Sequence, residues 1–204
     1  MNELEIEVKF FVGHPQELRR RILALGATGG GRVFERNEVF DDARRTLKSR
    51  GELLRLRQDT ACRLTYKQPG DPSQDQFKIQ CERETVVADG QVLRAVFQAL
   101  GLNTVLIYEK WRETFHQDGA HLCLDELPFG HFLEIEGTPA DIRRLAQTLE
   151  LPWKRRILVN YHQIFGLIAE SEALPFAHIT FDNFRGLTLD LQPYRHRFEA
   201  EPGR

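Results

Sequence analysis

The feature of this chain that most constrains its fold is a short stretch near the N-terminus, Glu5-Ile6-Glu7-Val8-Lys9, in which charged and apolar residues alternate. Alternation with a period of two is typical of a β-strand, because successive side chains point to opposite faces. Glu5 and Glu7 would then share one face, about 7 Å apart, with Lys9 just beyond them. Two carboxylates at that spacing can reach one hard cation or two neighbouring ones. The same pattern also suits the water-facing side of an ordinary antiparallel sheet, so the rest of the chain must decide between the two.

The composition is that of one globular domain without a strong excess of either charge. The 204 residues are 41% hydrophobic and 28% charged, so a chain of this length can bury a core of its own. The formal net charge of −2 argues against binding of nucleic acid through bulk charge, but it leaves room for a local basic site. Cys62, Cys81 and Cys123 are too few and too scattered for a disulfide framework or a zinc knuckle. Free thiols in a reducing compartment are therefore expected.

The chain also carries no sequence signal for export or for a membrane. Its N-terminus is acidic and polar, whereas a signal peptide begins with a basic and then an apolar segment. No apolar run approaches the ~20 residues that a membrane helix needs. We therefore expect a cytoplasmic monomer or homodimer that binds neither membranes nor nucleic acid.

The rest of the chain predicts seven further strands and four helices. Alternating or β-rich segments predict strands at 32–42, 53–57, 62–67, 76–87, 106–114, 121–126 and 132–136, and Asp118-Gly119 predicts a tight hairpin. Amphipathic stretches with capping residues predict helices at 15–25, 89–100, 138–149 and 159–169. The basic stretch 44–50 predicts a turn. The glycine triplet at 29–31 follows a helix instead of opening one, so it predicts a helix end and flexible turn, not a phosphate-binding loop.

Three of the predicted strands carry the same Glu-x-Glu pattern, and each is followed by an amphipathic helix. The pairs are Glu5 and Glu7, Glu82 and Glu84, and Glu134 and Glu136. The first two helices also end alike, in Leu-Ala-Leu-Gly at 23–26 and Gln-Ala-Leu-Gly at 98–101. This similarity suggests an internal duplication, with two halves of mixed β and α structure packed together.

Nearly every predicted strand has one apolar face and one charged face. The charged faces hold basic and acidic residues side by side: Lys9, Arg55, Arg57, Lys67, Lys78, Lys110 and Arg112, with Glu5, Glu7, Glu82, Glu84, Asp125, Glu134 and Glu136. In an open sheet these charges would be solvated and weakly paired. In a sheet that curls into a barrel they would line a lumen, where unpaired charges are too costly to keep and a polyvalent ligand is implied. Carboxylates suit Mg²⁺ or Mn²⁺ and rows of Arg and Lys suit phosphate oxygens, so the closed form fits a metal-bound polyphosphate.

Other chemistries find less support in the sequence. Ser49, Ser73 and Ser171 lie in turn-like or terminal contexts without a nucleophile-elbow motif. The seven histidines lack zinc spacing, and most should be solvated, with His131 and His162 the two that could belong to a site. No Walker-type or dinucleotide-binding fingerprint is present.

Seven segments resemble, in order, the CYTH family of class IV adenylyl cyclases and thiamine triphosphatases, whose members form triphosphate tunnel enzymes. They are the segments 5–9, 51–57, 64–67, 82–84, 109–114, 124–126 and 132–136. Asn160-Tyr161 stands where many members have Ser-Tyr. The match covers residues 1–170 as one domain, and residues 171–204 depart from it as a C-terminal extension.

The resemblance implies an α+β fold, an eight-stranded antiparallel β-barrel (the triphosphate tunnel) with helices packed outside. The implied ligands of Mg²⁺ or Mn²⁺ are Glu5, Glu7, Asp125, Glu134 and Glu136. The residues implied to bind substrate are Lys9, Arg55, Arg57, Lys67, Glu82, Lys110 and Arg112. Glu5, Glu7, Lys9 and Glu136 are the implied catalytic residues, and Lys9 is expected to act first as a phosphate ligand. Glu82 and Glu84 match the family's central acidic strand, where they either hold metal or orient basic residues, and the second role is favoured for Glu84.

For function, the resemblance implies metal-dependent hydrolysis of a small-molecule triphosphate, either tripolyphosphate, thiamine triphosphate or a nucleoside triphosphate. The first alternative is cyclisation of ATP to cyclic AMP and pyrophosphate, which uses the same metals and phosphate clamp. Recognised cyclases of the group tend to carry His-Phe just ahead of the first strand, where this chain has Glu3-Leu4, and this favours hydrolysis. The second alternative is a non-catalytic module that binds polyphosphate or nucleotide.

The C-terminal extension predicts two short strands, 175–181 and 187–191, around a turn at 183–186. We expect the extension to pack on the barrel and to cover an exposed sheet edge. Capping of the tunnel and pairing with another subunit are the alternatives.

Overall fold

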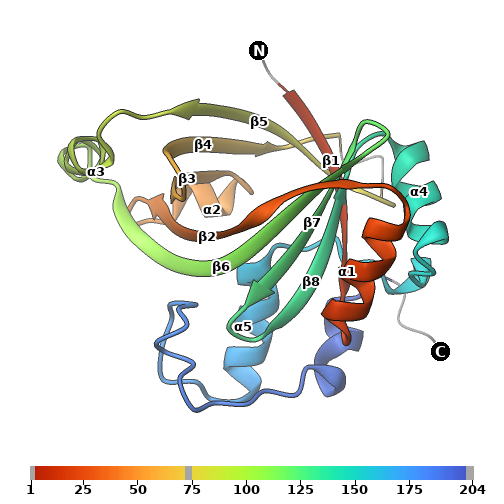
Figure 1. The fold of residues 1–204 in the computed structure, drawn as a ribbon. Helices are drawn as coiled ribbons and strands as arrows, with labels where there is room; N and C mark the ends of the chain where they lie inside the picture. The colour runs from red at the N-terminus through yellow and green to blue at the C-terminus, as the bar shows by residue number, and fades with distance from the viewer. Residues whose placement is uncertain (1–2, 72–74, 201–204) are drawn as a thin grey trace.

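The structure is a computed structural model that describes residues 3–71 and 75–200, which form a closed barrel of eight antiparallel strands (Figure 1). The ring order is β1-β5-β4-β3-β2-β6-β7-β8. The strands are β1 Glu3–Phe11, β2 Thr28–Asp41, β3 Leu53–Gln58, β4 Cys62–Pro69, β5 Lys78–Val86, β6 Asn103–Gln117, β7 Ala120–Leu127 and β8 Gly130–Glu136. The predicted α+β barrel and its eight strands are confirmed, and the charged faces of the strands turn inward.

The helices lie outside the barrel, as predicted. They are α1 Pro15–Ala24, α2 Thr46–Ser49, α3 Gly90–Ala99, α4 Pro139–Thr148 and α5 Tyr161–Ser171, with the 3₁₀ turns η1 Trp153–Arg155 and η2 Gln192–Arg197. Asp89 caps α3 and Thr138 caps α4, each by accepting hydrogen bonds from backbone N–H groups of the first turn. Nowhere in the described parts of the chain does a helix have the length and apolar character needed to cross a membrane.

The short helix α2 lies where the sequence predicted only a basic turn. Two consecutive carboxylates at the end of β2 stabilise it. Asp41 accepts hydrogen bonds from the backbone N–H groups of Leu47 and Lys48, and Asp42 accepts them from Arg44 and Thr46. The turn is therefore a single fixed helical turn that carries basic residues.

The order of the strands supports the predicted duplication. If β1 to β4 are exchanged with β5 to β8, the ring order reads the same in the opposite direction. The first strand of each half is inserted between strands of the other half, since β1 pairs with β8 and β5 pairs with β4. This exchange places the three Glu-x-Glu strands next to one another along the ring, in the order β8, β1, β5.

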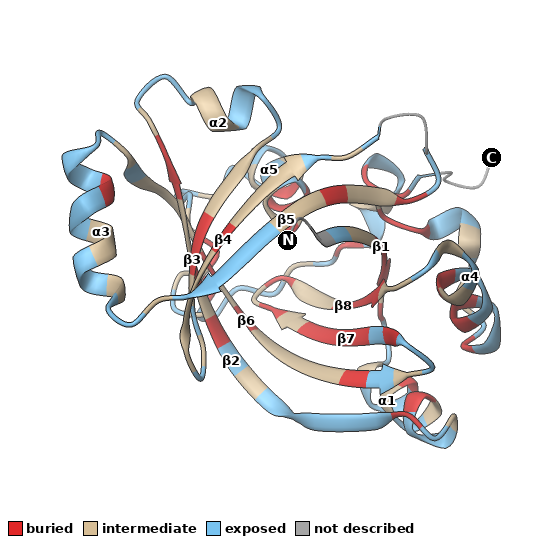
Figure 2. Cartoon of the chain, turned by 90° about the horizontal axis from the view of Figure 1, so that it is seen from above, coloured by how far each residue is buried: buried red, intermediate tan, exposed pale blue. Residues whose placement is uncertain are grey.

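The outward apolar faces of the strands form the core together with the helices. Val8 and Phe10 of β1 pack in one cluster with Ile22 of α1 and with Ile142 and Leu145 of α4. Figure 2 shows buried residues concentrated along β7 and β8. Because the helices take the apolar faces, the polar faces are left to enclose the lumen.

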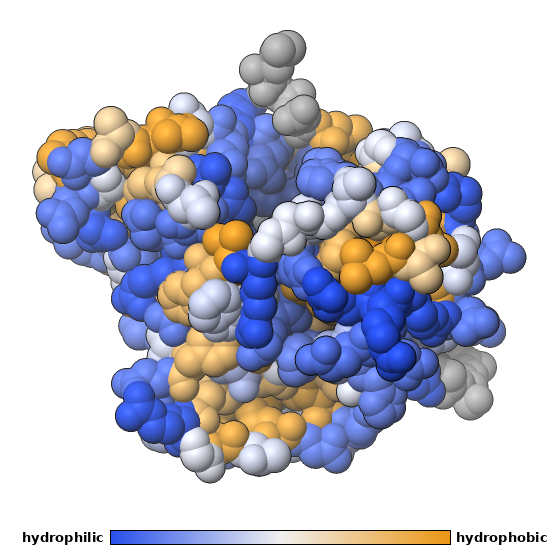
Figure 3. All heavy atoms as spheres, viewed as in Figure 1, coloured by the Kyte–Doolittle hydropathy of each residue, from blue (hydrophilic) through white to orange (hydrophobic). Residues whose placement is uncertain are grey.

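The third core cluster, under α3, is small and leaves part of that helix exposed. Phe97 of α3 packs on Phe40 and Leu56. Val92, Val96 and Leu100 remain exposed on the outer side, and Figure 3 shows an apolar patch over this helix.

The prediction of a flexible turn at residues 29–31 is wrong, because these glycines form the start of β2. Gly29 pairs with Phe115 of β6, and the register shifts between Gly29 and Arg32, so Gly30 and Gly31 lie in a bulge or irregularity of the strand. A Cβ atom on Gly29 would lie 2.8 Å from the ring of Phe115, closer than packing allows. The glycine is therefore needed for a close approach of backbone to ring, which the strand pattern alone does not reveal.

The two short strands predicted in the C-terminal extension are also wrong, since 175–181 and 187–191 are irregular. Their apolar residues pack in a second core cluster with α5, among them Ile179, Phe184 and Leu191. The expected covering of a strand edge is confirmed, however. The N–H of Ile179 donates to the carbonyl of Ile107 and its carbonyl accepts from Glu109, which lie where β6 extends beyond β7.

Candidate active site

The barrel encloses a cavity of about 1750 Å³, larger than the roughly 300–1,000 Å³ of most small-molecule sites. All the strands and the first turn of α5 contribute to its lining. Every residue predicted for the site lines this cavity except Asp125, which is fully buried behind it. The sequence pattern therefore identified the inner face of the barrel correctly.

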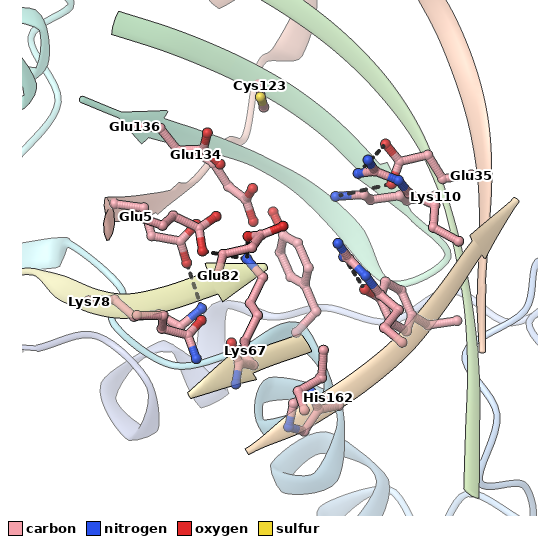
Figure 4. A pocket seen from close by; sticks show the side chains of 18 of the residues that line it. Glu5, Glu35, Lys67, Lys78, Glu82, Lys110, Cys123, Glu134, Glu136 and His162 are labelled. Carbon is pink, nitrogen blue, oxygen red and sulfur yellow. Dashed lines mark hydrogen bonds and ion pairs between the residues drawn. The ribbon is translucent and has the colours of Figure 1, made fainter. Parts of the chain in front are cut away.

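Three of the predicted metal ligands meet at one side of the cavity. One carboxylate oxygen each of Glu5, Glu7 and Glu136 lies within 4.8 Å of the others. The strand register explains this convergence, because Glu7 of β1 is paired with Glu136 of β8. Figure 4 shows Glu5 and Glu136 on the same side of the cavity, with Lys78 below them. We refer to Glu5, Glu7 and Glu136 as the carboxylate trio.

The carboxylates of the trio repel one another because they lie close together. Burial, followed by the charge of Glu7, raises the pKa of Glu5. Burial also acts to raise the pKa of Glu7, but Lys78 and Lys9 outweigh it and lower that pKa to about 2. The trio therefore combines a carboxylate that is hard to ionise with one that is firmly ionised. A bound cation would relieve this crowding, and the all-oxygen donor set suits a hard divalent ion.

Asp125 and Glu134, the other two predicted metal ligands, lie in ion pairs. Asp125 accepts hydrogen bonds from Lys110 at 3.0 Å, from Nε and Nη2 of Arg112 at 2.7 and 2.6 Å, and from Tyr161 at 2.8 Å. Glu134 contacts Arg112 and, at 3.2 Å, Lys9. The structure thus separates these two residues from the trio, and their role as metal ligands stays a prediction.

Most of the predicted phosphate-binding cations face a carboxylate across the cavity. Lys67 contacts Glu5 and lies 2.6 Å from Glu82. Arg57 donates to both oxygens of Glu84 at 3.1 Å. These pairs agree with an orienting role for Glu82 and Glu84.

Arg55 makes its hydrogen bonds to neutral groups. Its guanidinium donates to the hydroxyl of Tyr108 at 3.0 Å and to that of Thr65 at 3.1 Å, while Glu84 lies 3.9 Å away. Its Nε–H is buried and has no hydrogen-bond partner within the described parts of the chain. A buried cation that no carboxylate contacts at hydrogen-bond distance is available to an anionic ligand.

Lys9 is firmly protonated, as the sequence suggested. Burial alone would lower its pKa, but Glu134 and Glu7 raise it above the usual value for lysine. The ammonium lies 2.5 Å from Glu7. A lysine held in this state is not suited to accept a proton, and its role as a phosphate ligand stays a prediction.

Lys78 and Glu35 are among the charged residues of the cavity that were not predicted as site residues. Lys78 was noticed as part of a charged face, and its ammonium donates to Glu7 at 2.6 Å. Glu35 lies opposite the trio with Lys110 3.6 Å away, and Figure 4 shows this pair across the cavity. The alternation of residues along β2, applied as it was to β1, could have found Glu35.

The comparisons with known proteins agree with this geometry. A family model described as "CYTH domain" matches residues 3–173. A protein of Methanocaldococcus jannaschii named "Putative adenylate cyclase" is 27% identical over 150 residues, which cover 72% of this chain and 84% of that protein.

Two solved structures share the fold. One from Vibrio parahaemolyticus, described as a "putative adenylate cyclase", superposes with a TM-score of 0.72 at 20% identity, covering 81% of this chain and 99% of that one. Another, from Hippeastrum, superposes with a TM-score of 0.57 at 18% identity, covering 84% of this chain and 98% of that one, and is described as a "Putative adenylyl cyclase" that "reveals a dominant" triphosphatase activity. The family match, the closed barrel and the enclosed charges lead to one assignment: this chain belongs to the CYTH domain family.

Proposed function

We propose that this protein hydrolyses a triphosphate with the help of a divalent metal ion. The observation that carries the proposal is the carboxylate trio, whose oxygens lie within 4.8 Å of one another and beside Lys9 and Lys78. Such a trio is expensive to bury unless a cation joins it, and the nearby ammonium groups are suited to the phosphates that such a cation would carry.

Glu5, Glu7 and Glu136 would hold Mg²⁺ or Mn²⁺. When bound, the ion would neutralise developing charge on phosphate oxygens and lower the pKa of water for attack on the terminal phosphorus. The protein's own cations would bind the phosphate chain and stabilise the transferring phosphoryl group electrostatically. Because most of these cations are paired with carboxylates in the structure, a phosphate chain would replace carboxylate oxygens as their partners, and the positive charge of the metal ion would offset the carboxylates that are released.

Adenylyl cyclisation is the second candidate, favoured by the name of the Methanocaldococcus jannaschii relative. It would use the same trio and cations, but a ribose 3′-oxygen would attack the α-phosphorus and pyrophosphate would leave. The Hippeastrum protein, described as a cyclase with dominant triphosphatase activity, illustrates that both activities are discussed for this fold. A non-catalytic module is the third candidate, and a complete carboxylate trio argues against it, because a pure anion binder needs the cations more than the acids.

The products distinguish the three candidates. Purified protein is incubated with tripolyphosphate, thiamine triphosphate or ATP, each with Mg²⁺ or Mn²⁺. Hydrolysis predicts orthophosphate from at least one substrate, and cyclisation predicts cyclic AMP with pyrophosphate from ATP. Binding of tripolyphosphate without any product would overturn both catalytic proposals.

A further inference from the structure

The floor of the cavity carries one histidine that the proposed mechanism does not use. His162 is the second residue of α5, is half-buried and lines the cavity. Within the described parts of the chain, neither of its ring nitrogens has a hydrogen-bond partner. A side chain in this position that neither packs in the core nor pairs with a neighbour is open to a ligand.

The charges that act on His162 are all positive and come from three different elements. They are Lys78 on β5, Lys48 on α2 and Lys9 on β1. Burial, followed by these three lysines, lowers the pKa of His162 to about 4. The imidazole is therefore neutral near pH 7, with one N–H donor and one acceptor nitrogen.

This part of the cavity differs from the rest because its positive charge is less well balanced. Lys48 is exposed at the rim, and no described carboxylate lies within ion-pair distance of it. Lys9 and Lys78 share Glu7 as a carboxylate partner, and Lys9 has a second one, Glu134 at 3.2 Å. The N-terminal end of α5, whose Gln163 side chain accepts from the backbone N–H of Asn160, adds the partial positive charge of a helix start. Figure 4 shows His162 at the bottom of the view, to the lower right of Lys78.

We propose that His162, together with Lys48 and Lys78, contacts a phosphate group of the substrate in this part of the cavity and takes up a proton from solvent when that phosphate binds. The inference rests on the proposed function for the identity of the ligand. A phosphate between the three lysines would cancel the positive field that keeps the imidazole neutral. The pKa of His162 would then rise from about 4 toward or above its usual value of about 6.5, and the protonated ring would donate to the phosphate.

The sign of the pH dependence follows from this coupling. A group that binds a proton more tightly in the complex than in the free protein strengthens binding as pH falls through the interval between the two pKa values. We therefore expect tripolyphosphate to bind more tightly at pH 6 than at pH 8 and to draw a proton from the buffer at pH 6.

The test is a calorimetric titration of tripolyphosphate at pH 6 in EDTA, in two buffers with different heats of ionisation. Without divalent ions the measurement reports the protein's own contacts and needs no turnover. Wild-type protein should take up a fraction of a proton on binding. His162→Gln should lose that uptake and bind about ten-fold more weakly, as expected for loss of a charge-assisted hydrogen bond. The matched control is His196→Gln, on the exposed surface of η2, which should behave as the wild type.

A second pair of variants tests the inference independently of whether His162→Gln folds normally. Lys48→Ala, at the rim, should weaken binding several-fold, whereas Lys154→Ala, exposed outside the cavity, should not. Unchanged proton uptake and affinity in His162→Gln with normal thermal unfolding would overturn the inference. If wild-type protein shows the uptake but releases no product with Mg²⁺ or Mn²⁺, the hydrolysis proposal fails while the phosphate contact is supported.

Discussion

At the scale of single residues, the cavity wall is a set of mutually dependent charges. Asp125 is fully buried and accepts hydrogen bonds from Lys110, Arg112 and Tyr161. Burial and Asp125 together raise the pKa of Tyr161, so its hydroxyl remains a donor. Asp125 therefore neutralises two buried cations and fixes their direction, whatever further role it has in metal binding.

Asp125→Ala should for this reason destabilise the fold. Removal of one partner leaves Lys110 and Arg112 buried without their main counter-charge, which costs about 3–5 kcal/mol of unfolding free energy. Asp182→Ala is the control, because its ion pair with Arg185 is exposed and should contribute less than about 1 kcal/mol. Chemical denaturation of both variants measures the difference, and equal stabilities would contradict the assigned network.

Glu35 predicts a pH dependence of stability. Burial acts to raise its pKa, but Lys110 and Arg112 outweigh it, with Arg57 and Arg55, and lower the pKa to about 2. A carboxylate with a lowered folded-state pKa stabilises the protein above its unfolded pKa of about 4.3, and this stabilisation is lost as pH falls toward 2. The difference between the two pKa values corresponds to at most about 3 kcal/mol of unfolding free energy.

Glu35→Gln should therefore flatten the loss of unfolding free energy between about pH 4.5 and pH 2. Glu170→Gln is the matched control, since Glu170 is 79% exposed and its closest cation is 3.8 Å away. Denaturant titrations across this range would reveal the effect. Parallel acid profiles for the wild type and Glu35→Gln would refute the stabilising role of Glu35.

At the scale of elements, the C-terminal extension covers part of the edge of β6 that β7 does not reach. β6 is longer than β7, so its residues near Ile107 and Glu109 would present unpaired backbone groups. Ile179 pairs with both, and the apolar residues that follow it pack on α5. The covered part of β6 includes Tyr108, whose hydroxyl accepts from Arg55. The extension thus supports a strand that positions a cavity cation.

Ile179→Ala should lower the unfolding free energy by about 2–5 kcal/mol, because the side chain is fully buried and its removal leaves a cavity. Leu187→Ala, in the same extension but 45% exposed, should cost much less. Thermal unfolding of the two variants tests this comparison. A loss in Leu187→Ala as large as that in Ile179→Ala would argue against specific packing of the extension on β6.

At the scale of the whole molecule, period-two alternation predicted the charged face of each strand, because it is a local signal. The residues alone left open whether these faces point outward from an open sheet or line a lumen, and the resemblance to the CYTH family implied the closed barrel that brings Glu5, Lys67 and Glu136 together. The repeated Glu-x-Glu strands suggested the duplication. Ion pairing could not be predicted in the same way. Whether Asp125 faces the cavity or lies behind Arg112 depends on register and shear across several strands.

The two wrong predictions, the turn at Gly29 and the strands in the C-terminal extension, also have local causes. Gly29 is predicted to lie in a turn because the glycine triplet follows the end of a helix, whereas the structure places it in β2, in close approach to Phe115. The segment around Ile179 has the composition of a strand but makes a single bridge, since its other side chains pack on a helix. In both cases tertiary contacts override local preference.

The proposed function depends on the carboxylate trio binding a catalytic divalent ion inside the charged barrel. The most direct test is orthophosphate release from tripolyphosphate by wild-type protein and Glu136→Gln, each with and without Mg²⁺ or Mn²⁺. We expect metal-dependent release by the wild type, and a rate at least about 100-fold lower in the variant with little change in thermal unfolding. Full metal-dependent activity in a folded Glu136→Gln protein would contradict it.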